Sequence, residues 1–124
     1  MAQWQVMGWV NAIAAVLMGF IYPIRLKMQT NRWLIPVYRT ARLIHPAVGM
    51  AMILVALLHG SMALGQLRLH SGLVIVILLI LMALTALAGR QIGVLKNRWR
   101  SVHRTLGIVM LVSLAAHLVF PWWL

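Results

Sequence analysis

Four long apolar stretches constrain this chain more than any other feature. They cover residues 4–23, 44–65, 71–89 and 103–121, with short segments between them. Each stretch is close to the roughly 20 apolar residues that a helix needs to cross the hydrocarbon core of a bilayer. Because lipid offers no hydrogen bonds to free backbone groups, stretches of this kind must be helical. We therefore expect an all-α membrane protein, in which a single domain, residues 1–124, forms an antiparallel bundle of four transmembrane helices.

The composition agrees with membrane insertion and narrows the choice of cofactor. Of the 124 residues, 64% are hydrophobic and only 9% are charged, which is far from the average of soluble domains. The chain has no cysteine, which excludes disulfides, cysteine-held iron–sulfur clusters and covalently attached c-type haem. No Lys or Arg precedes the first apolar stretch and no cleavage site of small residues follows a short apolar core. We therefore expect no removable signal peptide.

The basic residues are distributed unequally between the two sides of the predicted bundle. The chain has 11 Lys and Arg and no Asp or Glu. In chain order the basic residues are Arg25, Lys27, Arg32, Arg39, Arg42, Arg68, Arg90, Lys96, Arg98, Arg100 and Arg104. All but Arg68 fall on one side. The positive-inside rule then predicts a multi-pass protein of the bacterial or archaeal plasma membrane, with cytoplasmic basic loops and both termini external. No nucleic-acid partner is expected, because the basic residues flank spanning helices; anionic lipid or an acidic partner is expected instead.

Histidine provides the strongest functional signal, because ionisable residues inside spanning helices are costly. Thirteen residues separate His45 from His59, and thirteen separate His103 from His117. The two histidines of a pair are fourteen helical steps apart, which is about 40° short of four full turns and a rise of about 21 Å. Both therefore lie on the same face of their helix, one near each edge of the bilayer core. The second and fourth helices run parallel, which makes His45 level with His103 and His59 level with His117. We expect two haem b groups, with His45 and His103 on the cytoplasmic-side iron and His59 and His117 on the outer-side iron.

The sequence around the first histidine of each pair recurs at an offset of 58 residues. An arginine, Arg42 or Arg100, stands three residues before the histidine, and a glycine, Gly49 or Gly107, stands four residues after it. The glycines predict room for a porphyrin beside the backbone. The arginines, together with Arg104, are expected to pair with the propionates of the cytoplasmic-side haem.

Fewer residues on the outer side are candidates for contacts with a haem or a quinol. Arg68 is the only basic side chain there and is expected to serve the outer haem. His70 is expected to be an interfacial histidine or, alternatively, the proton acceptor for a quinol, because the chain has no carboxylate side chain. The first stretch carries a stripe of small residues, which predicts close helix packing or space for a haem edge. Its members are Gly8, Ala12, Ala15 and Gly19.

Residues 40–121 resemble the haem-binding core shared by ferric reductases, NADPH oxidases and related bacterial membrane cytochromes b. The resemblance rests on the two helices with paired histidines and on His103–Gly107, H-R-T-L-G, which is similar to the H-R-x-L-G opening of a ligand helix in that superfamily. The spacing also resembles that of cytochrome b in quinol:cytochrome c reductases. The resemblance implies that the four histidines bind two stacked haems, one per leaflet, and that the chain carries electrons across the membrane.

Two departures from those families shape the expected role. The 124 residues contain no flavin and nicotinamide domain, and they do not reproduce the glycine spacing of the quinol-oxidising cytochrome b. We expect a non-catalytic electron-transfer subunit in the lipid bilayer that needs a redox partner protein on at least one face. The alternatives are a quinone-linked membrane anchor subunit of an oxidoreductase complex and a haem-free transport or assembly protein. Zinc and copper sites are less consistent with the spacing, because they gather their ligands in one coordination sphere.

Overall fold

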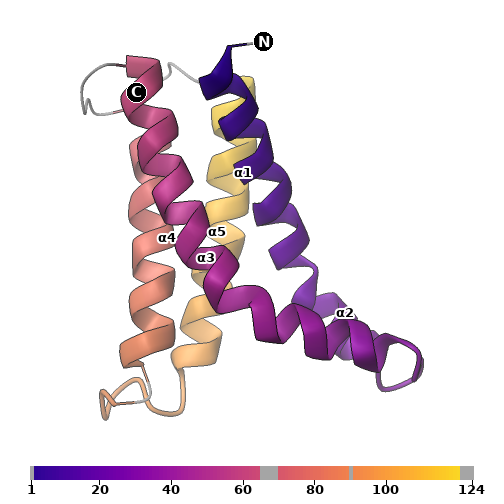
Figure 1. Ribbon diagram of the computed structural model, residues 1–124. Helices are drawn as coiled ribbons and strands as arrows, with labels where there is room; N and C mark the ends of the chain where they lie inside the picture. The colour runs from indigo at the N-terminus through magenta and orange to yellow at the C-terminus, as the bar shows by residue number, and fades with distance from the viewer. Residues whose placement is uncertain (1, 65–69, 90, 121–124) are drawn as a thin grey trace.

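The described part of the chain is entirely helical apart from short connections. The computed structural model describes residues 2–64, 70–89 and 91–120, and no strand occurs within them (Figure 1). The helices are α1 (Gln3–Gly19), α2 (Ile21–Lys27), α3 (Leu34–Leu64), α4 (Ser71–Ala88) and α5 (Trp99–Val119). Four segments, Gln3–Lys27, Leu34–Ala63, Ser71–Ala88 and Trp99–Val119, are long and apolar enough to cross a membrane. The all-α prediction is confirmed for these residues, and the four segments indicate a multi-pass membrane protein.

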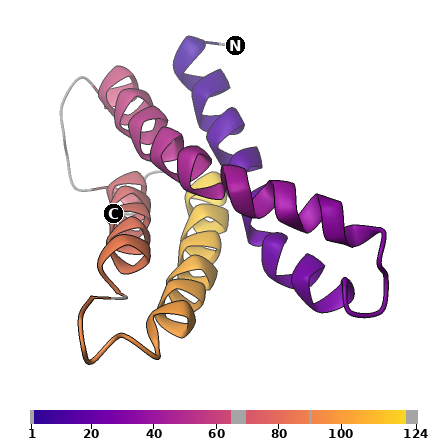
Figure 2. The same cartoon turned by 60° about the horizontal axis from the view of Figure 1, so that its bottom comes forward.

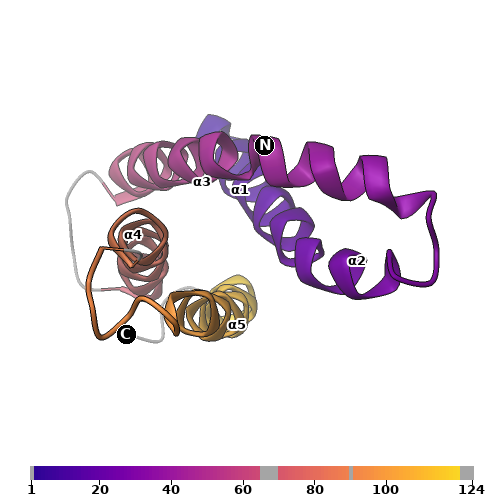
Figure 3. The same cartoon turned by 90° about the horizontal axis from the view of Figure 1, so that it is seen from below.

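The four long helices form a ring. Helix α1 packs against α3, α3 against α4, α4 against α5, and α5 against α1. Consequently α3 and α5, which carry the paired histidines, lie diagonally across the ring, and their described residues make no direct backbone contact. Figure 3 shows the ring from below, with α4 and α5 nearly end-on. We call the end that holds the start of α1 and the ends of α3 and α5 the upper end, and the opposite one the lower end (Figure 1).

The interior of the ring is filled by apolar side chains of small or medium size. The buried cluster consists of Ala15, Met52, Ala56, Ile75, Val76, Leu78, Leu79 and Met110. In contrast, many large apolar side chains face outward, among them Leu87 at 70% exposure and Val112 at 65%. Monomeric soluble proteins rarely expose large contiguous apolar surfaces, whereas lipid accepts them. The two alanines of the cluster, Ala15 and Ala56, allow close approach of neighbouring helices, as small residues do between helices in membranes.

Part of the chain expected to be a loop is helical. Residues 24–43 were predicted to connect the first two spanning helices, but α2 and the first part of α3 occupy most of this segment. Figure 2 shows these two pieces lying side by side and projecting from the ring, and we call them, with the turn at 28–33, the arm. A prediction from hydropathy ends a spanning helix at the first charged residues. Because arginine and leucine are good helix formers, the helix itself continues past the apolar stretch.

Two prolines explain why the arm leaves the ring at an angle. Pro23 has no N–H to donate to the carbonyl of Gly19, where α1 ends. Pro46 lies inside α3 and likewise cannot donate to the carbonyl of Arg42. A proline inside a helix usually kinks it, and α3 is visibly bent (Figure 1). The bend falls next to His45, so the arm begins where one of the paired histidines lies.

Candidate functional site

His45 on α3 and His103 on α5 face each other across the ring in its lower half. Their ring centroids are 5.9 Å apart and the ring planes are inclined by 70°. Both side chains are partly buried. The structure therefore brings together the two histidines that the helix spacing placed at one level, although their helices do not pack directly against each other.

Each of these two imidazoles is held through its Nδ1 atom. The Nδ1 of His103 lies 3.0 Å from the backbone carbonyl oxygen of Met82 on α4, and 3.4 Å from the Oγ1 of Thr85. The Nδ1 of His45 lies 3.3 Å from the Sδ of Met18 on α1. A carbonyl oxygen and a thioether sulfur accept hydrogen bonds but cannot donate them, so each Nδ1 carries the proton in the neutral ring. This tautomer leaves the lone pair on Nε2.

The histidines near the upper end follow the same arrangement. The Nδ1 of His59 donates to the backbone carbonyl oxygen of Trp4 at 2.7 Å, and the two rings lie 6.0 Å apart. The Nδ1 of His117 lies 2.6 Å from the Oγ of Ser71, a hydroxyl that can donate or accept. All four paired histidines are thus anchored at Nδ1 by a neighbouring helix. None of the described residues hydrogen-bonds their Nε2 atoms.

His59 and His117 line one cavity inside the ring. The cavity has a volume of about 290 Å³ and receives side chains from α1, α3, α4 and α5. Its walls are largely apolar and include Ala12, Ala15 and Met110 from the interior of the ring. His70, at the start of α4, lines the same cavity and is partly buried. A cavity walled by apolar groups with a few convergent histidines has the character of a ligand site.

Two glycines allow the upper histidines to reach this cavity. A Cβ atom added to Gly8 would lie 2.9 Å from Cε1 of His59. A Cβ added to Gly72 would lie 2.9 Å from Nε2 of His70 and 3.4 Å from Cε1 of His117. The stripe of small residues on α1 therefore makes room for a histidine ring as well as for a neighbouring helix. Gly72 carried no comparable signal in the sequence, and its neighbours are His70, two residues before it, and His117 on α5.

The glycines predicted to admit a porphyrin have more open surroundings. No described atom lies within 4 Å of a Cβ built on Gly49, and the nearest atom to one on Gly107 is Cε of Met82 at 3.4 Å. Both glycines are partly exposed. Space therefore remains beside α3 one turn beyond His45, and the use of this space by a porphyrin stays a prediction.

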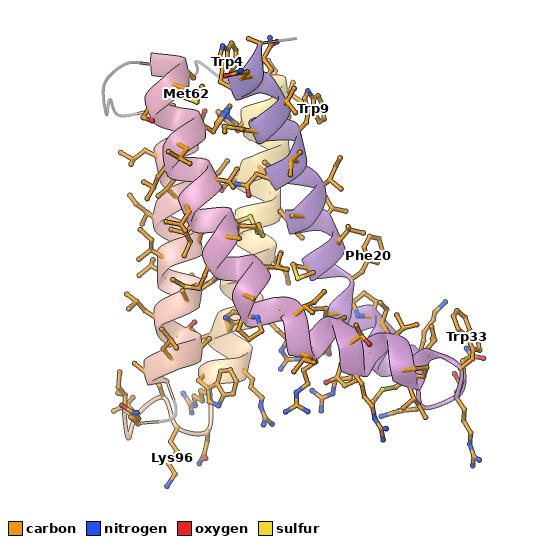
Figure 4. The ribbon with its side chains drawn as sticks, viewed as in Figure 1. Trp4, Trp9, Phe20, Trp33, Met62 and Lys96 are labelled. Atoms are coloured by element: carbon orange, nitrogen blue, oxygen red, sulfur yellow. The ribbon has the colours of Figure 1, made fainter. Side chains whose placement is uncertain are left out.

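The predicted arginines lie at the lower end, outside the ring. Arg42, Arg100 and Arg104 are exposed, and none of them forms a hydrogen bond with the side chain of His45 or His103. The guanidinium of Arg100 lies 5.4 Å from the ring centroid of Trp99, and that of Arg104 lies 4.8 Å from the ring centroid of Tyr22 on α2. Long basic side chains are gathered along this end and the arm in Figure 4, where Lys96 is labelled. Arg68 lies outside the described residues.

No three His, Cys, Asp or Glu side chains within residues 2–64, 70–89 and 91–120 come together as a metal-binding group. Comparisons with models of protein families, with curated proteins and with solved structures find no match to this chain.

Proposed function

We propose that this protein is a dihaem b-type cytochrome subunit that carries electrons across a membrane. The observation that carries the proposal is the shared anchoring of the four paired histidines, each held at Nδ1 by a neighbouring helix. Histidines that bind metals nearly always donate their other ring N–H to a carboxylate, a backbone carbonyl or water, which sets the tautomer and the ring orientation. His59 and His103 have a backbone carbonyl in this position, while His45 has a thioether and His117 a hydroxyl. A histidine that only cross-links two helices needs no such uniform arrangement.

The distance between His45 and His103 fits the pair of axial ligands of one iron. An imidazole nitrogen lies about 2 Å from a metal it binds and roughly 1 Å from the centre of its own ring, so two such rings have centres about 6 Å apart. The observed separation is 5.9 Å. At the upper level, the ligand pair would be His59 and His117, which line one cavity.

Bound haem supplies a one-electron iron couple at each level, and bis-histidine ligation favours electron transfer over chemistry at the iron. The chain contributes the surroundings. The apolar interior around Met110 and Ala15 excludes water, and the basic lower end raises the electrostatic potential there, which favours an added electron. A redox partner protein on at least one face would supply or remove electrons.

The membrane arrangement is part of the proposal. We place the four segments as an antiparallel bundle in a bacterial or archaeal plasma membrane, with the basic lower end cytoplasmic and both termini external. Its support is the exposed apolar surface of the ring and the concentration of basic side chains at one end. The arm, apolar on part of its surface and rich in arginine, would lie at the inner interface.

Optical spectra of the purified protein test the haem assignment. In mild detergent, oxidised and dithionite-reduced spectra with a pyridine haemochrome count should give two low-spin b haems per chain. The variants His59→Ala and His103→Ala should each retain one haem, and the control His70→Ala should retain both. A colourless protein, expressed with haem available, would refute the proposal and favour the haem-free transport or assembly alternative.

One observation favours a second candidate, a quinone-linked anchor subunit. His70 lines the cavity shared by His59 and His117, where it would accept a proton from a quinol. This candidate predicts that a quinol reduces the upper haem and that His70→Ala slows the reduction more than tenfold without loss of haem. Equal rates in the two proteins would rule out this role for His70.

A further inference from the structure

A pocket at the lower end, between α2 and the start of α5, concentrates positive charge. Its volume is about 400 Å³. Its polar lining consists of Arg25, Gln29, Asn97, Arg100, Ser101 and Arg104. We propose that this arginine pocket binds the headgroup of an anionic phospholipid. The inference rests on membrane insertion, which belongs to the proposed function, but it does not rest on haem.

No acidic side chain of the protein balances the positive charge of the pocket. The whole sequence contains no Asp or Glu, so no acidic side chain can neutralise the three guanidinium groups. Arg100 and Arg104 are four residues apart on α5, a spacing at which like charges destabilise a helix. A bound anion would remove this repulsion. Arginine also suits phosphate better than lysine does, because its planar group donates two parallel hydrogen bonds.

The arginines are partly pre-arranged. The guanidinium of Arg104 lies over the ring of Tyr22, and its Nε donates to the backbone carbonyl of Arg100 at 3.2 Å. The guanidinium of Arg100 lies over Trp99. These contacts restrict two long side chains before any ligand binds, which lowers the entropic cost of binding.

The position of the pocket favours a lipid over a free anion. It lies where the segment Gln3–Lys27 ends and the segment Trp99–Val119 begins, so it would sit at the level of the headgroups. Leu26 and Tyr22 line it and are 51% and 41% exposed. An anion site bordered by exposed apolar side chains matches a molecule with a charged head and acyl chains.

Lipid titration in detergent tests the proposal. The full chain, purified in dodecylmaltoside, is mixed with phosphatidylglycerol or phosphatidylcholine, and bound lipid is counted by native mass spectrometry. The pocket variant is Arg100→Gln/Arg104→Gln. The matched control, Arg32→Gln/Arg39→Gln, removes the same charge from exposed arm positions outside the pocket. The variant Arg100→Lys/Arg104→Lys keeps the charge.

We expect one tightly bound phosphatidylglycerol in the parent protein and little retained phosphatidylcholine. Affinity for phosphatidylglycerol should fall about 30-fold in the pocket variant, at about fivefold per basic residue, and less than twofold in the control. The affinity of the lysine variant should fall between those of the parent and the pocket variant, because it keeps the charge but loses the paired hydrogen bonds of the guanidinium groups. Equal loss in the pocket variant and the control would refute a specific site, and so would equal retention of the two lipids. Displacement of the lipid by millimolar inorganic phosphate would overturn the assignment to a lipid.

Two readouts on the same samples separate this inference from the proposed function. Haem content reports on the histidine sites, and the requirement for detergent to keep the chain in solution reports on membrane insertion. Lost lipid discrimination with haem and detergent dependence unchanged refutes only the arginine pocket. A chain that is soluble without detergent refutes membrane insertion and the lipid site together.

Discussion

Replacement of Gly8 by alanine tests the role of the small residues around the upper histidines. The new Cβ would lie 2.9 Å from Cε1 and 3.3 Å from Nδ1 of His59. Ordinary contacts begin near 3.4 Å, so the imidazole must move by about half an ångström. His59 cannot move freely, because its Nδ1 is held by the carbonyl of Trp4 at 2.7 Å. A shift of this size lengthens that hydrogen bond to about 3.2 Å, the upper end of the usual range, and so weakens it.

The expected cost follows from three contributions. Overpacking an interior site typically costs about 1–3 kcal/mol. A weakened hydrogen bond adds about 1 kcal/mol. Alanine in place of glycine inside a helix stabilises the folded protein by about 1 kcal/mol. The net destabilisation is therefore about 1–3 kcal/mol, concentrated at the upper site.

The matched control is Gly60→Ala on α3. Gly60 lies beside His59 in the chain, but a Cβ there would meet nothing within 4 Å, so alanine should stabilise the helix slightly. Thermal denaturation in detergent and the haem count per chain are compared for the two variants. We expect Gly8→Ala to melt several degrees lower and to lose the upper haem first, while Gly60→Ala matches or exceeds the parent. If the two variants retain haem and melt alike, the argument about space around His59 is wrong.

Two further predictions concern the anchoring of the histidines and the bend in α3. Ser71→Ala removes the hydroxyl that contacts Nδ1 of His117 and should weaken retention of the upper haem by about 1 kcal/mol. Thr85→Val should change retention of the lower haem little, because the carbonyl of Met82 still holds His103. Haem release to apomyoglobin measures both, and equal effects would contradict the anchoring scheme. Pro46→Ala restores a backbone donor inside α3 and should straighten the helix, which displaces the arm and perturbs the spectrum of the lower haem alone. An unchanged spectrum together with a higher melting temperature would show that the bend is not needed for the lower site.

The four long apolar helices could be predicted from the sequence because their signal is local. A run of about 20 apolar residues is helical in lipid whatever its neighbours are, since only a helix satisfies its own backbone. The predicted stretches 71–89 and 103–121 correspond closely to α4, Ser71–Ala88, and α5, Trp99–Val119. The face and the depth of each histidine follow from the same helical period, so the meeting of His45 and His103 could also be expected.

The arm was missed for a related reason. Hydropathy locates where a chain leaves the hydrocarbon, but a helix continues as long as its backbone hydrogen bonds do. Residues 34–43 carry charged and polar side chains and still belong to α3, Leu34–Leu64. The sequence did contain a usable signal, since Pro23 and Pro46 mark the two positions where the helical hydrogen bonding must be interrupted.

The sequence by itself determined four apolar helices, the two depths of the histidines and the excess of positive charge near one end. Only the tertiary structure decided which groups surround each imidazole: the carbonyl of Trp4 for His59, Ser71 for His117 and the carbonyl of Met82 for His103. It also brought Arg25 beside Arg100 and Arg104. The physical reason is that periodicity within one helix sets the direction of a side chain on that helix, while its partners depend on how each neighbouring helix is rotated and shifted as they pack together.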